Sequence, residues 1–370
     1  MRHRAGMRAM ARIAILILLA AGSAFALNVT VTNSPYNAVS DDGLDDSAAF
    51  ASALNDIVAD GGGTLAVPCG NYDFTNKVTV DLHAAAVTIA GDGAAVSVLN
   101  CTSNNTDGVF LFNNTDSCNQ LTLKDFTIEA EQLGGTAIAV FNPSLSTAAI
   151  CSLSMQNVTI MPAVDQVNYF TCHVDAANLK SPVFYNVVAA AAIRIGYTMT
   201  AYRIATVDSP VFEQTYVKHA DVGYRLTGIQ GAANFYRAYC SDTRFGYDLA
   251  ATPAQTATLR MRHFHSGAYD QGINVSDFDQ VEILEHMSYA GDVTSTIFLD
   301  QVFTDCANVN IKGTIFHAMV RIPRTMISLK GTTHDVFIED NIFNGRGTAV
   351  GQDSTVRGVL MVGCHDNSQE

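Results

Sequence analysis

The sequence predicts an all-β solenoid, in which short strands stack coil upon coil behind a single N-terminal helix. Short segments of apolar alternation recur along the chain at steps of 21 to 31 residues, which is the spacing of one strand–turn–strand coil. No second run of apolar residues at helical spacing follows Ala59, and this argues against a fold of alternating strands and helices. A β-sandwich, which also has short strands and regular turns, is the alternative fold.

The first 26 residues have the composition of a secretory signal peptide. Four arginines precede the apolar run Ile13–Ala21, and Ala24-Phe25-Ala26 is a small-x-small cleavage site. A membrane anchor is less favoured, because the apolar run is shorter than the ~20 residues that cross a bilayer. We therefore expect a secreted, extracellular protein (periplasmic if bacterial), with residues 27–370 forming one domain that has no membrane contact after the signal is removed.

Residues 37–72 are expected to form a cap module at the start of the solenoid. Asp45, Asp46 and Ser47 stand where N-cap and first-turn residues belong, and apolar residues follow at helical spacing. Gly61 to Gly63 are expected to end the helix, because glycine adopts left-handed dihedrals without a side-chain clash. A short strand then follows before Pro68.

This cap module resembles the start of the pectate lyase superfamily of right-handed parallel β-helices. In that family a D-D-G-x-D-D/T segment leads into a helix that caps the solenoid, and residues 41–46 are similar to it. The first coil of the family then starts with G-G-G-T-L-x-x-P-x-G-x-Y, which Gly61 to Tyr72 match. The resemblance implies a right-handed parallel β-helix with an N-terminal capping helix. Lyases, glycosidases, epimerases and viral tailspikes share this start, so the fold does not define the reaction.

Two elements recur within the coils. The first is a short strand that ends in a polar step, as in Leu121–Ile128, Leu153–Ile160 and Val183–Val188. The second is a small residue followed by apolar alternation, as in Gly223–Leu226 and Gly246–Leu249. Because side chains alternate across a strand, each coil buries its inward stripe only by stacking on its neighbours.

The charge and the aromatic composition of the chain limit the classes of partner that it can bind. Without the four leader arginines the chain has 17 Lys and Arg against 35 Asp and Glu, a net charge of −18. This excess disfavours nucleic acid and anionic membranes as partners. It also argues mildly against a polyanionic substrate, although a local basic patch can override the global charge. The chain has no tryptophan, so the tyrosines at positions 224, 247, 269 and 289 are the candidates for stacking on a sugar.

The eight cysteines all follow the leader, and an even number in a secreted chain permits disulfides. No Cys-x-x-Cys spacing occurs, so neither a metal site nor a redox motif is predicted. Stacking two of the repeated strands would bring Cys118 and Cys151 to neighbouring coils, and Cys69 with Cys101 is a second candidate pair. Six sequons are either chance matches or glycan sites of a secretory product: Asn28, Asn100, Asn104, Asn113, Asn157 and Asn274.

Polar residues concentrate between positions 213 and 324, on what we expect to be a groove across the outside of successive coils. Each could also be an isolated surface or turn-capping residue, but titratable groups stacked together perturb one another's pKa values. The predicted catalytic residues are Asp242, Asp270, Glu285, His265 and His286. The predicted substrate-binding residues are Lys218, Arg244, Tyr269 and Tyr289, and no metal ligands are predicted.

Two reactions fit these residues. Glycoside hydrolysis needs a carboxylic acid and a carboxylate, which Asp242, Asp270 and Glu285 would supply from three consecutive coils. β-Elimination on a uronate needs a base and a cation or metal ion that neutralises the substrate carboxylate; the candidates are Lys218, His219, Arg244 and His265. No cofactor is predicted, except Ca²⁺ if the protein is a lyase. The motifs of polygalacturonases and mannuronan epimerases are absent from this region.

The sequence therefore predicts a secreted carbohydrate-active enzyme that cleaves a polysaccharide, as a lyase or a glycoside hydrolase. The alternative is a non-catalytic glycan-binding or structural spike protein on a virion or cell surface. Such a protein would be compatible with an oligomer, a trimer if it is spike-like. The sequons and the missing catalytic signatures favour the alternative, and the polar cluster favours the enzyme.

Overall fold

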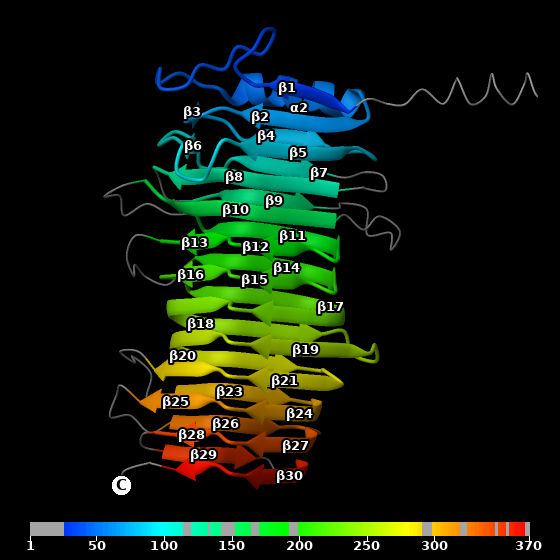
Figure 1. Ribbon diagram of the computed structural model, residues 1–370, viewed down its shortest axis with the longest axis vertical. Helices are drawn as coiled ribbons and strands as arrows, with labels where there is room; N and C mark the ends of the chain where they lie inside the picture. The colour runs from blue at the N-terminus through cyan, green and yellow to red at the C-terminus, as the bar shows by residue number, and fades with distance from the viewer. Residues whose placement is uncertain are drawn as a thin grey trace, which may run out of the picture.

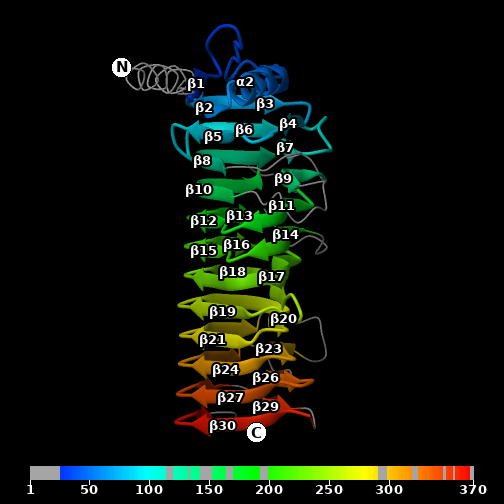
Figure 2. The same cartoon turned by 90° about the vertical axis from the view of Figure 1, so that its right-hand side faces the viewer.

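The structure is a computed structural model that describes residues 26–113, 120–131, 134–141, 152–163, 170–191, 199–290, 298–318, 324–344, 347–352 and 355–366. Within these ranges it has one helix, α2 (Ser47–Ala59), and 31 strands that pair in parallel. The coils stack along the long axis of the molecule, from α2 at one end to β30 (Arg357–Val362) at the other (Figures 1 and 2). The predicted right-handed parallel β-helix with an N-terminal capping helix is confirmed.

Each coil passes through three columns of strands. The first column consists of β1 (Leu27–Thr30), β2 (Gly62–Val67), β5 (Ala86–Gly91), the first halves of β8 (Gln120–Ala130) and β10 (Ser152–Pro162), β12 (Val183–Tyr185), β15 (Val211–Glu213), the second half of β17 (Val222–Tyr236), β19 (Ala257–Arg262), β21 (Gln280–Leu284), β24 (Ala307–Lys312), β27 (His334–Glu339) and β30. The second column consists of β3 (Gly70–Phe74), β6 (Ser97–Cys101), the second halves of β8 and β10, β13 (Val188–Ala190), β16 (Tyr216–Lys218), the first halves of β18 (Tyr239–Ala251) and β20 (His265–Ser276), β22 (Met287–Ala290), β25 (Ile315–Ala318), β28 (Ile342–Phe343) and β31 (His365–Asp366). The third column consists of β4 (Val78–Asp81), β7 (Phe110–Asn113), β9 (Thr136–Phe141), β11 (Cys172–Lys180), β14 (Thr200–Asp208), the first half of β17, the second halves of β18 and β20, β23 (Phe298–Thr304), β26 (Arg324–Lys330) and β29 (Gly347–Gln352).

Helix α2 covers the core at the N-terminal end of the solenoid (Figure 1). Phe50, Leu54 and Ile57 on its inner face are fully buried. The ring of Phe50 packs edge-on against Phe74 of the first coil, with centroids 4.9 Å apart. The apolar stripe read from the sequence is therefore the surface that seals the stack.

Asp46 stands at the N-cap of α2 but its side chain makes no capping hydrogen bond. Its carboxylate instead accepts hydrogen bonds from the backbone N–H groups of Val39 (3.0 Å) and Asp73 (3.2 Å). Burial raises the pKa of Asp46 to about 6. The predicted N-cap position of Asp46 is confirmed, but its side chain ties the cap module to the first coil instead of capping the helix.

Two glycines of the run Gly61–Gly63 are required by close packing between strands. A Cβ atom on Gly63 would lie 1.9 Å from the carbonyl oxygen of Leu27, and one on Gly62 would lie 2.5 Å from that of Ala86. Gly62 and Gly63 begin β2, between β1 and β5. The glycine run therefore lets the backbones of β1, β2 and β5 pack closely against one another, and it also ends the helix.

The polar step that recurs in the sequence is a one-residue turn between the first and second columns. Asp125, Asn157 and Asn186 occupy it with φ of 62°, 53° and 50°, a left-handed conformation that Asn and Asp tolerate best after glycine. Asn157 Nδ2 donates to Asp125 Oδ1 (2.8 Å), and Asn186 Nδ2 donates to Asn157 Oδ1 (2.9 Å). The side chains form a ladder that joins three coils.

Aromatic rings stack inside the solenoid at equivalent positions of neighbouring coils. Tyr202, Tyr224 and Tyr247 lie parallel with centroids 4.9 Å apart, and all three are buried. The expectation that Tyr224 and Tyr247 stack on a sugar is therefore wrong. Their rings belong to the core, where the hydroxyl of Tyr247 donates to the carbonyl of Ala238 (2.7 Å).

The six cysteines in the described ranges are free thiols: Cys69, Cys101, Cys172, Cys240, Cys306 and Cys364. Cys101 is buried next to Phe74 whereas Cys69 is exposed, so the predicted Cys69–Cys101 bond is wrong. Cys118 and Cys151 lie outside the described residues, as does the predicted signal peptide up to residue 25. No helix in the described ranges has the length and apolar character needed to cross a membrane.

One of the predicted sequons lies inside the folded structure. Asn100 is only 4% exposed, and its Nδ2 donates to Asp73 Oδ1 (2.8 Å) and Glu131 Oε1 (2.7 Å). A glycan on this nitrogen would break both hydrogen bonds. By contrast, Asn28 and Asn104 are exposed, so glycosylation of these two remains a prediction.

Candidate functional site

The corner between the second and third columns has a ladder of alternating charge. Asp221, Arg244 and Asp270 come from three consecutive coils, the last two from β18 and β20. Arg244 Nε lies 2.9 Å from Asp221 Oδ1 and 3.6 Å from Asp270 Oδ2, and Arg244 Nη2 donates to Asp221 Oδ2 (3.4 Å). One guanidinium group therefore contacts two carboxylates, whose oxygens are at most 6.5 Å apart.

The two carboxylates differ in burial and in neighbours. Burial raises the pKa of Asp221, while the charges of Arg244 and Arg225 oppose this shift and the charge of Asp270 adds to it. The Asp221 side chain is only 18% exposed, against 25% for Asp270. Asp221 thus holds its proton to a higher pH than an exposed aspartate does.

A second pair of polar residues lies at the same corner. His219 and Asp242 follow the second-column strands of adjacent coils, each with a left-handed φ of 58° or 53°. His219 Nε2 lies 3.6 Å from Asp242 Oδ2, which also accepts from Ser241 Oγ (3.2 Å). Lys218 pairs in register with Ser241, so it belongs to this corner as well.

The outer side of the second column presents a row of rings. His265 and Tyr289 meet edge to face with centroids 4.9 Å apart, and Tyr289 stacks on His317 at 5.3 Å. Burial lowers the pKa of His265, against the opposing effects of a hydrogen bond to the Cys240 backbone and of the Asp242 charge. His265 is therefore mostly neutral near pH 7 and able to accept a proton.

Glu285 does not join this corner. It occupies the turn between the first and second columns with φ of 54°, at the opposite end of its second-column strand from the Asp242 position. Its side chain is 61% exposed and ion-paired with His263 Nδ1. The expected grouping of Glu285 with Asp242 and Asp270 is wrong, because the turn directs it to another edge of the solenoid.

His286 lies inside the core, so the expectation that it lines the outer groove is wrong. Its ring stacks on Phe264 at 4.2 Å. Its Nε2 lies 2.8 Å from Ser266 Oγ and its Nδ1 lies 2.8 Å from Gln301 Nε2. Burial holds the pKa of His286 well below its usual range, which makes it a neutral structural residue.

The structure thus brings Lys218, Asp242, Arg244, Asp270 and His265 to one region, with Tyr289 beside His265. Tyr269 belongs to β20, but its side chain lies outside the described residues. No group of three or more His, Cys, Asp or Glu side chains in the described ranges is arranged to hold a metal ion.

Asp221 is the residue that the sequence-based selection left out. The sequence does contain the information needed to select Asp221. Aligning the repeats at Gly223 and Gly246 places Asp221 at the position equivalent to Arg244, one coil earlier. The polar surface also continues onto the third column, where Arg225 Nε lies 3.1 Å from Asp248 Oδ2. Asn274 Nδ2 extends this row by donating to Asp248 Oδ1 (3.0 Å).

The sequence matches no protein-family model and no curated protein. Solved structures do share the fold. The A-module of the mannuronan C-5 epimerase AlgE6 from Azotobacter vinelandii superposes with a TM-score of 0.63 at 12% identity, over 92% of this chain and 100% of that chain. PfbA, a surface adhesin of Streptococcus pneumoniae, superposes with a TM-score of 0.51 at 11% identity, over 93% of each chain.

A viral protein has the same architecture. The pre-mature gene product 12 of bacteriophage phi29 superposes with a TM-score of 0.56 at 12% identity, over 97% of this chain and 58% of that chain. Identities this low show a shared fold alone. Because an epimerase, an adhesin and a phage protein all have it, the function has to be argued from the side chains.

Proposed function

We propose that this chain is a secreted member of the pectate lyase superfamily that hydrolyses a polysaccharide at the corner between the second and third columns. The observation that supports this most is the pair of carboxylates around Arg244: Asp221, with a raised pKa, and Asp270. Glycoside hydrolysis uses one protonated and one ionised carboxyl group. Carboxylates alone carry out this reaction, so the proposal requires no cofactor.

In this proposal Asp221 is the acid that protonates the departing glycosidic oxygen, and Asp270 is the carboxylate that attacks the sugar or activates water. Retaining glycosidases hold the two carboxyl groups about 5–5.5 Å apart and inverting ones about 6.5–9.5 Å apart. The upper limit of 6.5 Å between one oxygen of each carboxylate is compatible with the retaining range and reaches only the lower end of the inverting range. Asp242 and His265 would orient the substrate, and Tyr289 would contact a sugar ring.

The proposal is tested by incubating the protein with a panel of neutral and acidic polysaccharides and measuring new reducing ends. We expect release by the wild type, and a loss of at least about 100-fold in Asp221→Asn and Asp270→Asn, because an amide cannot transfer the proton. Asp335→Asn is the matched control, since this exposed aspartate lies on a distant coil. Full activity in both corner variants would rule out the assigned residues. Ultraviolet absorbance of the product would instead identify a lyase, for which Ca²⁺ dependence would then be examined.

A non-catalytic glycan-binding or structural protein is the second candidate. It is favoured by the ladder itself, since Arg244 ties the two carboxylates together much as Arg225 ties Asp248 on the third column. Rows of ion pairs between coils also stabilise a solenoid without any reaction. A protein of this kind would retain the polysaccharide unchanged in the same assay.

A further inference from the structure

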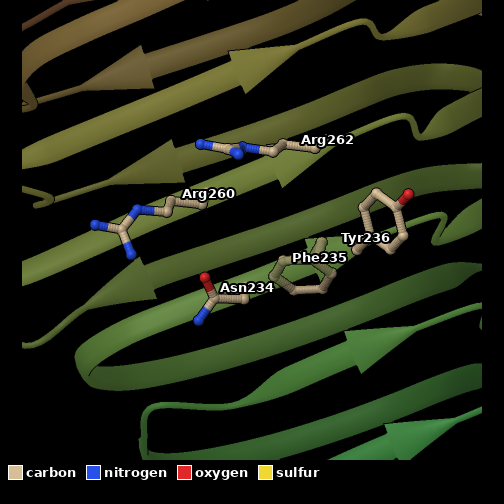
Figure 3. A pocket seen from close by; sticks show the side chains of 5 residues that line it. All are labelled: Asn234, Phe235, Tyr236, Arg260 and Arg262. Atoms are coloured by element: carbon tan, nitrogen blue, oxygen red, sulfur yellow. The ribbon is translucent and has the colours of Figure 1, made fainter.

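A cleft lies on the outer side of the first column, away from the corner that holds Asp221 and Asp270. It has a volume of about 290 Å³ and is lined by Asn234, Phe235, Tyr236, Arg260 and Arg262. These residues come from β17 and β19, which are adjacent rungs (Figure 3). The residues on its two sides pair in register, Asn234 with Arg260 and Tyr236 with Arg262.

A core residue forms the base of the cleft. Phe235 points into the core, where it is 1% exposed and stacks on Phe212 with centroids 4.8 Å apart. Alternation along β17 therefore turns its neighbours Asn234 and Tyr236 outward. Figure 3 shows the guanidinium groups of Arg260 and Arg262 extending toward the same side of the cleft.

The two arginines have different surroundings. Arg262 Nη2 donates to Glu282 Oε2 at 2.6 Å, so one carboxylate already balances its charge. Arg260 is exposed, and none of the ion pairs among the described residues includes it. No carboxylate lines the cleft. Glu282 pairs in register with Arg260 on the next rung, but its carboxylate is bonded to Arg262. Arg260 therefore presents a positive charge that has no ion-pair partner among the described residues to this small hollow.

Tyr236 supplies an aromatic wall at the end of the cleft where it pairs in register with Arg262, across the cleft from the Arg260 guanidinium. The guanidinium carbon of Arg237 lies 5.1 Å from the centre of the Tyr236 ring, and His263 meets the ring edge to face at 5.5 Å. These contacts hold the ring in place. On the other side, Asn234 Nδ2 donates to the Ala232 carbonyl (2.9 Å), which leaves Oδ1 to accept from a hydroxyl group.

We propose that this cleft binds the anionic group of an acidic saccharide, a carboxylate or a sulfate ester. Arg260 is the anion ligand, because its planar fork of N–H donors matches either group in bidentate geometry. Tyr236 contacts the sugar ring and Asn234 accepts from a sugar hydroxyl. The choice of a sugar as the ligand rests on the proposed function; the choice of an anion rests on Arg260 and the cleft alone.

The test is titration calorimetry with three tetrasaccharides that share a β-1,4-linked glucose backbone. One is unmodified, one carries the C6 carboxylate of glucuronic acid, and one carries a 6-sulfate. We expect at least one acidic form to bind about tenfold or more tightly than the neutral form, and the preference between the two to show which anion the cleft takes. Added salt should weaken this binding, because the charge of Arg260 carries it.

Variants connect the binding to the cleft. Arg260→Gln should reduce affinity for the acidic form about tenfold or more, and Arg260→Lys should give an intermediate loss, because it keeps the charge without the fork. Arg357→Gln removes one exposed arginine on the last coil and should leave affinity unchanged. Equal affinity for neutral and acidic forms, or unchanged affinity in Arg260→Gln, would overturn the proposal.

The cleft and the corner can be tested separately. Asp221→Asn and Asp270→Asn should keep the Arg260-dependent binding even though hydrolysis is lost, because the cleft lies on another column. Inorganic sulfate, which has no sugar ring, should compete with the acidic tetrasaccharide in the wild type and not in Arg260→Gln. If sulfate competes equally in both, the anion binds elsewhere and Arg260 is not its ligand.

Discussion

The Nε atom of Arg244 lies 2.9 Å from Oδ1 of Asp221, across the gap between two adjacent coils. The contact joins residues 23 positions apart, which become neighbours only because the repeat stacks one coil on the next. It places a cation beside a carboxyl group whose pKa is nevertheless raised, since burial outweighs the attraction. Stacking therefore creates both the ion pair and the proton-holding group at this corner.

The activity that we propose should fall as pH rises through the folded-state pKa of Asp221, because the acid must be protonated. The charge of Arg225 opposes the rise in this pKa. Arg225→Gln should therefore move the basic limb of kcat/KM to higher pH, and Arg357→Gln should not move it. The measurement is the pH profile of kcat/KM for the three proteins. An unshifted limb in Arg225→Gln would mean that Asp221 is not the titrating acid.

Arg244→Gln should destabilise the fold at pH 7 by about 1–2 kcal/mol, because two half-buried carboxylates lose their shared counter-charge. The loss should shrink at pH 4, because the raised pKa of Asp221 favours its uncharged form as pH falls. Adding Asp221→Asn to Arg244→Gln should recover part of it. Urea denaturation at both pH values measures these differences. A loss of the same size at both pH values would show that the guanidinium acts through packing alone.

The buried His286 should make the protein sensitive to acid. Its folded-state pKa is lowered by burial, so its contribution to stability is present above the unfolded pKa of about 6.5 and is lost as pH falls below it. His173, with a pKa lowered to about 3 by full burial, acts in the same direction. The two histidines should therefore lower the free energy of unfolding between pH 7.5 and 5, against the opposite effect of Asp46, whose pKa of about 6 adds stability as pH falls.

The variant His286→Gln isolates this effect. It should be less stable than the wild type at pH 7.5, where the hydrogen bond of His286 with Ser266 or Gln301 is lost. Its stability should depend less on pH between 7.5 and 5, because one proton-binding difference is removed. Parallel pH dependence in the two proteins would contradict the neutral, buried state of His286.

The turn ladder predicts an order of stability at position 157. Asn157→Gly should cost about 1 kcal/mol, because it loses the ladder amide but keeps the left-handed turn. Asn157→Ala should cost about 2–3 kcal/mol, since alanine also strains at a φ of 53°. Thermal and urea unfolding of the two variants test this order. Equal stability of the two would show that backbone conformation contributes little at this turn.

The fold could be predicted from the sequence because its structural elements repeat along the chain. The recurring polar step at Asp125 and Asn157 is a local signal, because these residue types favour the left-handed turn whatever lies around them. The glycine run Gly61–Gly63 and the apolar stripe of α2 are local signals as well. Each indicates its own structure within a few residues, so the cap and the coil period could be predicted without any contact map.

The site depended on a different kind of information. Glu285 and His286 are consecutive, yet one is exposed in a turn and the other is buried against Phe264. A shift of one residue in strand phase exchanges the outer and inner faces, and an irregular corner can shift the phase. The sequence-based selection therefore assigned His286, Tyr224 and Tyr247 to the outer face although they lie in the core, and it grouped Glu285 with residues of another edge.

By itself, the sequence determined the period of the coils, the helical cap and the positions of the turns, because alternation, glycine and Asn or Asp turns act over a few neighbouring residues. Only the tertiary structure decided that Arg244 lies between Asp221 and Asp270, and that Arg260 and Tyr236 line one cleft. These pairs are more than 20 positions apart in the chain. Their contacts depend on the register between rungs, which no single stretch of sequence contains.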